Sequence, residues 1–80
     1  MNIASVKIEN GYIYIEDDKG YRVGNPIKWF KRLSGATKEQ LNNFKLSPFG
    51  IHWEELDEDL SFEGIVRQIN PSETFEYAKN

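Results

Sequence analysis

The sequence predicts a small α+β fold, in which an antiparallel sheet of three to five short strands packs against two or three short helices. Three observations lead to this prediction. Apolar and polar residues alternate near the N-terminus, helix-start signals recur in the middle, and an apolar stripe at helical spacing follows Ser61. At 80 residues, the chain is long enough for one domain. We expect a compact domain over residues 1–70 and a C-terminal tail or arm over residues 71–80.

The first third of the chain is expected to form an antiparallel meander. Residues 3–9 alternate in the way of a half-buried strand, with Ile3 on the polar side, and residues 12–16 form the returning strand. Between them, Asn10-Gly11 is a strong hairpin signal, because both central residues of a type I′ turn need a positive φ. A second turn then leads to a third short strand over residues 21–23.

A helix is expected over residues 26–33. Asn25 is placed to cap it, and Pro26 suits the first helical position because its missing N–H has no partner there in any case. The segment also interleaves cations with two aromatic residues, Trp29 and Phe30, as single-stranded nucleic-acid binders do. At helical spacing, however, the aromatic residues face the core and the cations face water, which is the interpretation that the sequence favours.

A second short helix and two further strands are expected in the middle of the chain. Thr37 followed by Gln40 matches a capping box and predicts a helix over residues 38–43. Residues 44–46 are a candidate fourth strand. Residues 51–53 are a candidate edge strand, since they lie between a glycine and an acidic segment.

Residues 50–61 are the densest part of the sequence, with its only histidine, its second tryptophan and five of its thirteen acidic residues. Residues 56–60 are expected to form a loop that turns Leu56 and Leu60 inward. Ser61 is a good N-cap for a helix whose apolar stripe runs from residue 62 to residue 69.

The composition limits the function classes. There is no cysteine, so disulfides and thiolate metal sites are excluded, and no apolar run approaches the roughly 18 residues of a membrane span. We expect a cytoplasmic protein without membrane contact. The net charge of −3 makes general nucleic-acid binding unfavourable and favours a positively charged protein partner.

The segments 26–33, 36–40 and 50–61, followed by Gly64, resemble in order and spacing the bacterial family called domain of unknown function 2442. The resemblance covers about residues 6–66, and it departs where Lys31 stands in place of the usual proline. It implies a small α+β fold and a binding role, since members look similar to proteins found beside partner genes of toxin–antitoxin type. The expected structural signature consists of Trp29, Phe30, Gly50, Trp53, Leu56, Asp57, Asp59, Leu60, Ser61 and Gly64.

His52 and the acidic residues after it could form a metal or acid–base site, because imidazole and carboxylates are common metal ligands. The favoured alternative is structural: His52 is hydrogen-bonded to one acid, Asp57 and Asp59 accept backbone N–H groups, and Glu58 is solvated. A hydrolase triad of His52, Asp57 and Ser61 is rejected, because Ser61 is better explained as a helix cap. No catalytic residue, metal or cofactor is therefore predicted.

The leading hypothesis is a non-catalytic interaction domain, either an antitoxin-like protein or an inhibitor encoded by a mobile element. Its partner would be another protein with a basic patch, and a homodimer is a second possibility. The first alternative is a nucleic-acid regulator that uses the basic helix 26–33, and the second is a metal-dependent enzyme around His52 and Asp57. The candidate interaction surface consists of Lys28, Lys31, Arg32, His52, Glu54, Glu55 and Glu58.

Overall fold

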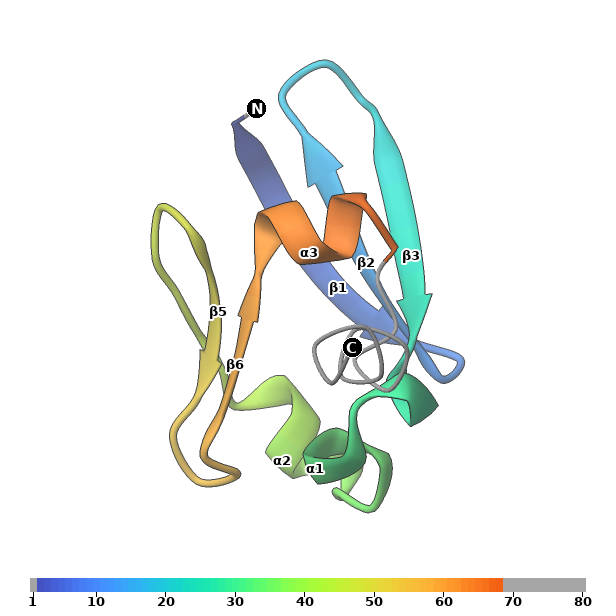
Figure 1. The fold of residues 1–80 in the computed structure, drawn as a ribbon, viewed down its shortest axis with the longest axis vertical. Helices are drawn as coiled ribbons and strands as arrows, with labels where there is room; N and C mark the ends of the chain where they lie inside the picture. Colours follow the sequence, from blue (N-terminus) through green and yellow to red (C-terminus); the bar gives the residue numbers. More distant parts are fainter. Residues whose placement is uncertain (1, 69–80) are drawn as a thin grey trace, which may run out of the picture.

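The computed structural model describes residues 2–68 and confirms the α+β class. Its strands form two antiparallel sheets of three strands each, in the orders β1-β2-β3 and β4-β5-β6. Short helical segments connect the two sheets. A last helix, α3, crosses in front of the first sheet, and β6 leads directly into it (Figure 1).

The first sheet is the expected meander of β1 (Ile3–Glu9), β2 (Tyr12–Asp17) and β3 (Arg22–Pro26). Its first turn has the left-handed backbone that the sequence predicts, with φ of 51° at Asn10 and 78° at Gly11. The meander is therefore fixed by the local turn chemistry as well as by the alternation of its side chains.

The alternation of β1 is interrupted at its start. Val6 and Ile8 lie opposite residues 15 and 13 of β2, but the register shifts between Ile3 and Ser5. Such a bulge moves a residue to the other face of the sheet. Ile3 consequently packs against the core beside Val6 and Ile8, and its expected place on the polar side was wrong.

The helix expected over residues 26–33 was also wrong in form. The segment divides into a 3₁₀ turn, η1 (Ile27–Trp29), and one turn of α-helix, α1 (Lys31–Ser34). Phe30 between them is extended, with φ −112° and ψ 102°. Ile27, Phe30 and Leu33 are nevertheless all buried in the core, as the spacing of a continuous helix would also have placed them.

Asn25 does not cap a helix. It lies in β3, is fully buried, and donates from Nδ2 to the carbonyl oxygen of Ile65 at 2.8 Å. Within residues 2–68, its Oδ1 has no hydrogen-bond partner. A buried amide is retained where its hydrogen bonds join separate elements, and this one joins the first sheet to α3.

The second helix, α2 (Lys38–Asn42), begins at the predicted capping box. The backbone N–H of Gln40 donates to Thr37 Oγ1 at 3.1 Å, and the N–H of Thr37 donates to Gln40 Oε1 at 2.9 Å. Near its end, the carbonyl oxygen of Leu41 accepts the indole N–H of Trp53 at 2.8 Å. This bond ties α2 to the second sheet.

The second sheet consists of β4 (Lys45–Leu46), β5 (Gly50–Trp53) and β6 (Glu58–Ser61). The loop expected over residues 56–60 was wrong, because most of it is β6. As a result β5 is the central strand of its sheet and not an edge strand. β5 pairs with β6 over residues 50–53 on one side, and with β4 at Ile51 and His52 on the other.

α3 (Phe62–Val66) is capped as predicted, since Ser61 Oγ accepts the backbone N–H of Gly64 at 3.0 Å. The helix ends at Val66 and is therefore shorter than expected from the apolar stripe over residues 62–69. Residue 69 and the tail expected over residues 71–80 lie outside the described residues.

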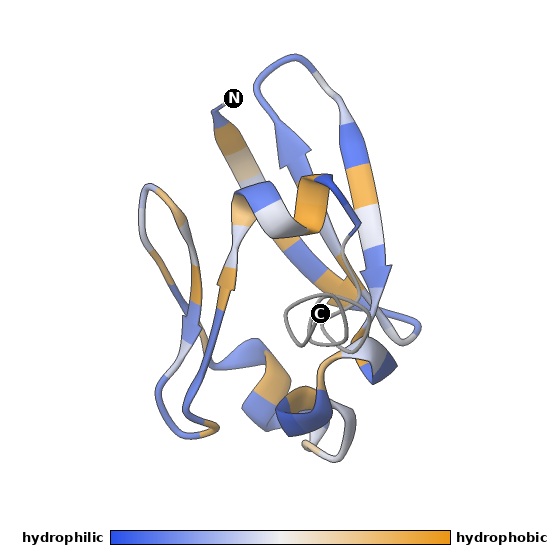
Figure 2. Ribbon diagram, viewed as in Figure 1, coloured by the Kyte–Doolittle hydropathy of each residue, from blue (hydrophilic) through white to orange (hydrophobic). Residues whose placement is uncertain are grey.

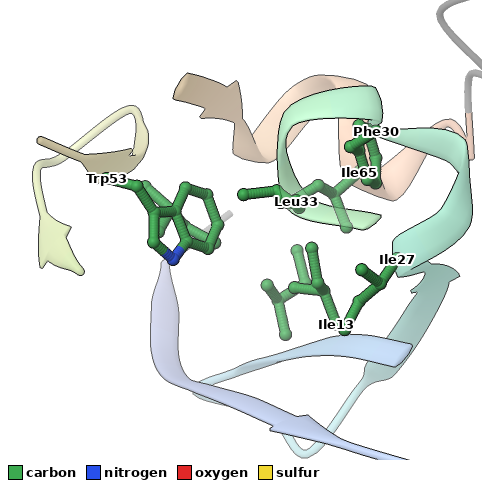
Figure 3. Close-up of a cluster of buried hydrophobic side chains, with 8 residues drawn as sticks. Ile13, Ile27, Phe30, Leu33, Trp53 and Ile65 are labelled. Atoms are coloured by element: carbon green, nitrogen blue, oxygen red, sulfur yellow. The ribbon is translucent and has the colours of Figure 1, made fainter. Parts of the chain in front are cut away.

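One apolar cluster holds these elements together. Figure 2 shows that apolar residues are spread over both sheets and over the helices. Figure 3 shows these side chains converging from strands and helical segments. The buried members are Ile13, Ile15, Ile27, Phe30, Leu33, Ile51, Trp53 and Ile65.

Candidate functional site

The outer face of the second sheet carries a polar row across all three strands. Lys45 lies opposite His52, and His52 lies opposite Asp59. His52 Nδ1 and Asp59 Oδ1 are 2.7 Å apart. The expected hydrogen bond between His52 and an acid is therefore present, although His52 lies on a central strand and not on an edge strand. We call Lys45, His52, Glu54 and Asp59 of this outer face, together with Phe49 in the turn just before β5, the second-sheet face.

Lys45 also forms an ion pair with Glu54, with Nζ and Oε2 3.4 Å apart. Both side chains are 77% exposed. Exposed pairs of this kind contribute about 0–1 kcal/mol to stability, because water screens the charges and ordering the side chains costs entropy. The Glu54 carboxylate can therefore exchange Lys45 for a cationic side chain of a partner at little cost.

The acidic turn between β5 and β6 is held by the helical segments. Arg32 of α1 donates from Nη1 to Asp57 Oδ2 at 2.9 Å and to the carbonyl oxygen of Asp57 at 2.8 Å. Gln40 of α2 donates from Nε2 to Glu55 Oε2 at 2.9 Å. The basic and acidic segments of the sequence therefore meet within one chain.

The expected roles of the acids need correction. Asp57 binds the guanidinium of Arg32 and Asp59 binds the imidazole of His52, whereas backbone N–H partners were expected for both. Glu58 was expected to be solvated, but it is half-buried and accepts the backbone N–H of Asp59 at 3.0 Å. Pairing with β5 fixes the backbone of Asp59, so its carboxylate is free to bind the side chain of His52.

The tip of the β4–β5 hairpin presents an aromatic side chain to solvent. Phe49 is 82% exposed, and Leu46 beside it is 54% exposed. The tip is well tied: Ser47 Oγ accepts the N–H groups of Phe49 and Gly50, each at 3.2 Å, and the Phe49 carbonyl accepts the N–H of Phe62 at 2.8 Å. This exposed aromatic residue was not predicted from the sequence. The available signal was a phenylalanine placed between proline and glycine in a turn.

Only part of the predicted interaction surface comes together. Arg32 and the residues His52, Glu54, Glu55 and Glu58 lie on or beside the second sheet. Lys28 lies in η1 and lines a different hollow together with Lys38 of α2. Lys31 is exposed on α1.

The signature residues are mainly structural. Phe30 and Trp53 are buried, and Trp29, Leu56 and Leu60 pack against the same core. Gly50 is required by a close approach, because a Cβ there would overlap the carbonyl oxygen of Leu60 in the adjacent strand.

The residues of the two catalytic alternatives, the metal site around His52 and the His52–Asp57–Ser61 triad, are not brought together in the described part of the chain. Within residues 2–68, the histidine and acids form no group of three or more that could hold a metal ion. His52 and Ser61 are engaged separately, with Asp59 and with the Gly64 N–H. In the same part of the chain, no helix has the length and apolar character needed to cross a membrane.

Comparisons with known proteins place this geometry in a family. No curated protein matches the chain. A solved structure of a protein of unknown function from Rhodospirillum rubrum has a TM-score of 0.73 and 26% identity, covering 86% of this chain and 88% of the other. A solution structure of an uncharacterized protein from Chromobacterium violaceum has a TM-score of 0.69 and 25% identity, covering 86% and 67%. The family model described as protein of unknown function DUF2442 matches residues 3–71, and the chain belongs to this family.

Proposed function

We propose that the protein is a non-catalytic interaction domain that binds another protein through the second-sheet face. The observation that carries this proposal is Phe49, an aromatic side chain that is 82% exposed on a turn fixed by hydrogen bonds. An exposed aromatic ring loses little conformational entropy on binding and can bury a large apolar area, which is why such residues dominate many interfaces. A turn that is already fixed lowers the ordering cost further.

The charge distribution supports a partner with a basic patch. Glu54 and Glu55 lie at the opposite end of β5 from Phe49, and five residue steps of extended chain separate Phe49 from Glu54 by about 17 Å. The His52 and Asp59 pair lies between these two ends. A partner spanning the face would meet an apolar anchor first and carboxylates at the far end, and the carboxylates would steer a basic surface into register.

An antitoxin-like protein, or an inhibitor encoded by a mobile element, is the cellular role that we propose for such a domain. In both roles a small acidic protein masks the functional surface of a basic protein, and recognition alone is enough. The imidazole and carboxylates of the second-sheet face then act as contacts and not as catalytic groups.

The test is an affinity pull-down from host lysate with the full chain and with Phe49→Ala. We expect a stoichiometric basic protein in the first and its loss in the second. Tyr21→Ala is the matched control, because Tyr21 is also an exposed aromatic residue, at 77%, but lies beside the first sheet. Capture that survives Phe49→Ala and is lost with Tyr21→Ala would overturn the assignment of the face, and turnover in a hydrolase screen would overturn the non-catalytic role.

A nucleic-acid-associated role for the segment 26–33 is the second candidate. It is favoured by Lys28 and Lys31, which are exposed and take part in no ion pair within residues 2–68. Arg32, by contrast, is occupied by Asp57. If this role holds, labelled single-stranded DNA or RNA binds at low salt, and Lys28→Glu with Lys31→Glu abolishes the binding. An absence of any shift at low ionic strength removes the candidate.

A further inference from the structure

β1 is an outer strand of the first sheet (Figure 1), and a groove lies along its free edge. Five consecutive residues, 6–10, line one wall, and Lys38, Asn42 and Phe44 line the other. Neighbouring side chains on a strand point to opposite faces, so a groove lined by every residue in turn runs along the backbone itself. The edge of β1 therefore opens into this groove, and α2 forms part of the opposite wall.

The backbone of β1 offers hydrogen-bonding groups to this groove. In the two-residue hairpin, Glu9 lies directly opposite Tyr12, so Glu9 and Lys7 direct their N–H and C=O groups toward β2. Val6 and Ile8, which alternate with them, direct theirs outward. Within residues 2–68, no backbone hydrogen bond reaches Val6 or Ile8 from outside the first sheet.

The groove continues into a hollow of about 620 Å³ between the first hairpin turn and the helical segments. The two spaces share five residues in their linings: Ile8, Glu9, Asn10, Lys38 and Asn42. Ile27, Leu33 and Leu41 give the hollow an apolar floor. A strand laid along β1 would thus have apolar surface beneath the side chains that point inward.

The rim of this combined groove has an excess of positive charge. Lys38 borders both spaces and Lys28 borders the hollow, and neither takes part in an ion pair within residues 2–68. The acid on the rim, Glu9, already contacts Lys7 and Arg22, each at 3.5 Å. In a chain of net charge −3, this local excess selects a negatively charged ligand.

We propose that the free edge of β1 binds an extended segment of a partner protein in which acidic and apolar residues alternate. The segment adds a fourth strand to the first sheet: its backbone pairs with Val6 and Ile8, its apolar side chains face inward, and its carboxylates meet Lys38 and Lys28. Backbone pairing requires a polypeptide. A second copy of β1 would bring one lysine and one glutamate. Their charges cancel, so they would not neutralise the excess positive charge of the rim.

The first test uses the full chain and an eight-residue peptide that alternates glutamate with valine and is blocked at both ends. Fluorescence anisotropy should show saturable binding, with Lys38→Glu weakening it about tenfold because an attraction becomes a repulsion. Lys31→Glu is the matched control, since it makes the same charge change outside the groove. Equal effects of the two variants, or equal binding of a peptide with lysine in place of glutamate, would overturn the proposal.

The second test examines the backbone pairing. Two versions of the peptide carry N-methyl groups on either the odd or the even residues, which removes alternate N–H donors. Only one set faces β1, so one version should lose at least tenfold in affinity and the other should keep most of it. In NMR spectra the amide signals of Val6 and Ile8 should shift on binding. Equal losses for both versions, with these amides unchanged, would exclude strand addition.

Two further measurements distinguish this proposal from binding at the second-sheet face and from other occupants of the groove. Phe49→Ala should leave peptide binding unchanged, so failure of the second-sheet face and failure of the β1 edge are distinguishable. Sedimentation of the free chain tests for a second copy in the groove. A dimer that dissociates when the peptide binds, or a single-stranded oligonucleotide that displaces the peptide, would overturn the choice of a partner protein as occupant.

Discussion

The two sheets of this molecule are built in different ways. The strands of the first are 7, 6 and 5 residues long, follow one another directly, and turn at an Asn-Gly pair. The strands of the second are 2, 4 and 4 residues long, and their turns pass through Pro48 and through an acidic segment. The first sheet can be specified by local sequence, whereas strands as short as those of the second need support from elsewhere.

That support comes from the helical segments and the core. Trp53 is fully buried and bound to α2, Arg32 of α1 holds the turn at Asp57, and α3 contacts both sheets. The outer face of the first sheet, by contrast, is ordered by its own side chains: Tyr12 stacks on Tyr14 at 5.8 Å between ring centroids. The second sheet should therefore be more sensitive to single substitutions than the first.

The largest effect is expected from Trp53→Ala. The change removes a fully buried ring from β5 and leaves the carbonyl of Leu41 without its partner. Large-to-small changes of this kind cost about 3–5 kcal/mol, a large part of the stability of a small domain. Urea denaturation followed by far-UV circular dichroism measures the loss.

Trp29→Ala is the control, because Trp29 is only half-buried at the edge of the same cluster. We expect roughly half of the loss seen for Trp53→Ala. Equal losses would mean that the second sheet does not depend on its central anchor.

The next largest effect compares one glycine from each sheet. A Cβ at Gly50 would overlap the backbone carbonyl of Leu60, whereas a Cβ at Gly24 would meet the ring of Tyr14 at 2.6 Å. A backbone cannot move without separating β5 from β6, but a half-exposed ring can turn aside. We expect Gly50→Ala to cost about 3 kcal/mol and Gly24→Ala about 1 kcal/mol.

Thermal unfolding of the two alanine variants checks this order. A smaller loss for Gly50→Ala than for Gly24→Ala would contradict the view that close backbone packing holds the second sheet.

The same contrast explains what could be predicted from the sequence. The meander, the capping box at Thr37 and the cap at Ser61 were predicted because their signals lie within four residues of one another. β6 was missed because its strand identity depends on pairing with β5. A run of acids and leucines resembles a loop until a neighbouring strand accepts its backbone.

The site was predicted in composition but not in arrangement. The pairing of His52 with an acid follows from residue types close in sequence. The contact of Arg32 with Asp57 joins residues 25 positions apart. The division of the segment 26–33 into two turns depends on how Phe30 packs into the core. Exposure of Phe49 also depends on the whole fold, because only the packed structure decides which apolar residues are left outside.

A smaller effect is expected at the junction between the first sheet and α3. Asn25→Ala removes the buried bond to the Ile65 carbonyl and leaves that carbonyl without a partner. The cost should be about 2 kcal/mol, since a buried acceptor loses its hydrogen bond without regaining water. Hydrogen exchange should show faster opening of α3 and little change in the β1–β2 hairpin. Asn2→Ala is the control, because Asn2 is exposed and its 3.4 Å contact with Asp18 is weak.

The smallest changes in stability are expected for substitutions at one turn of each sheet. There, alanine and glycine variants distinguish the cost of backbone strain from the contribution of an ion pair. The β1–β2 turn has Asn10 at φ 51° and the β5–β6 turn has Asp57 at φ 52°, and both side chains belong to types that tolerate this region. A left-handed backbone costs alanine about 1 kcal/mol more than glycine. Asn10→Ala should therefore be less stable than Asn10→Gly by about 1 kcal/mol, and Asp57→Ala less stable than Asp57→Gly by the same amount.

The comparison with the parent chain then isolates the ion pair. Both Asp57 variants lose the side-chain contact with Arg32, but the backbone carbonyl of residue 57 still accepts from the guanidinium. Asp57→Gly should accordingly lie within about 1 kcal/mol of the parent, as an exposed pair predicts. Denaturant midpoints measured at low and high salt test this. If Asp57→Gly were destabilised by as much as Gly50→Ala, the contact between Arg32 and the acidic turn, and not the packing of β5 against β6, would be what holds the second sheet.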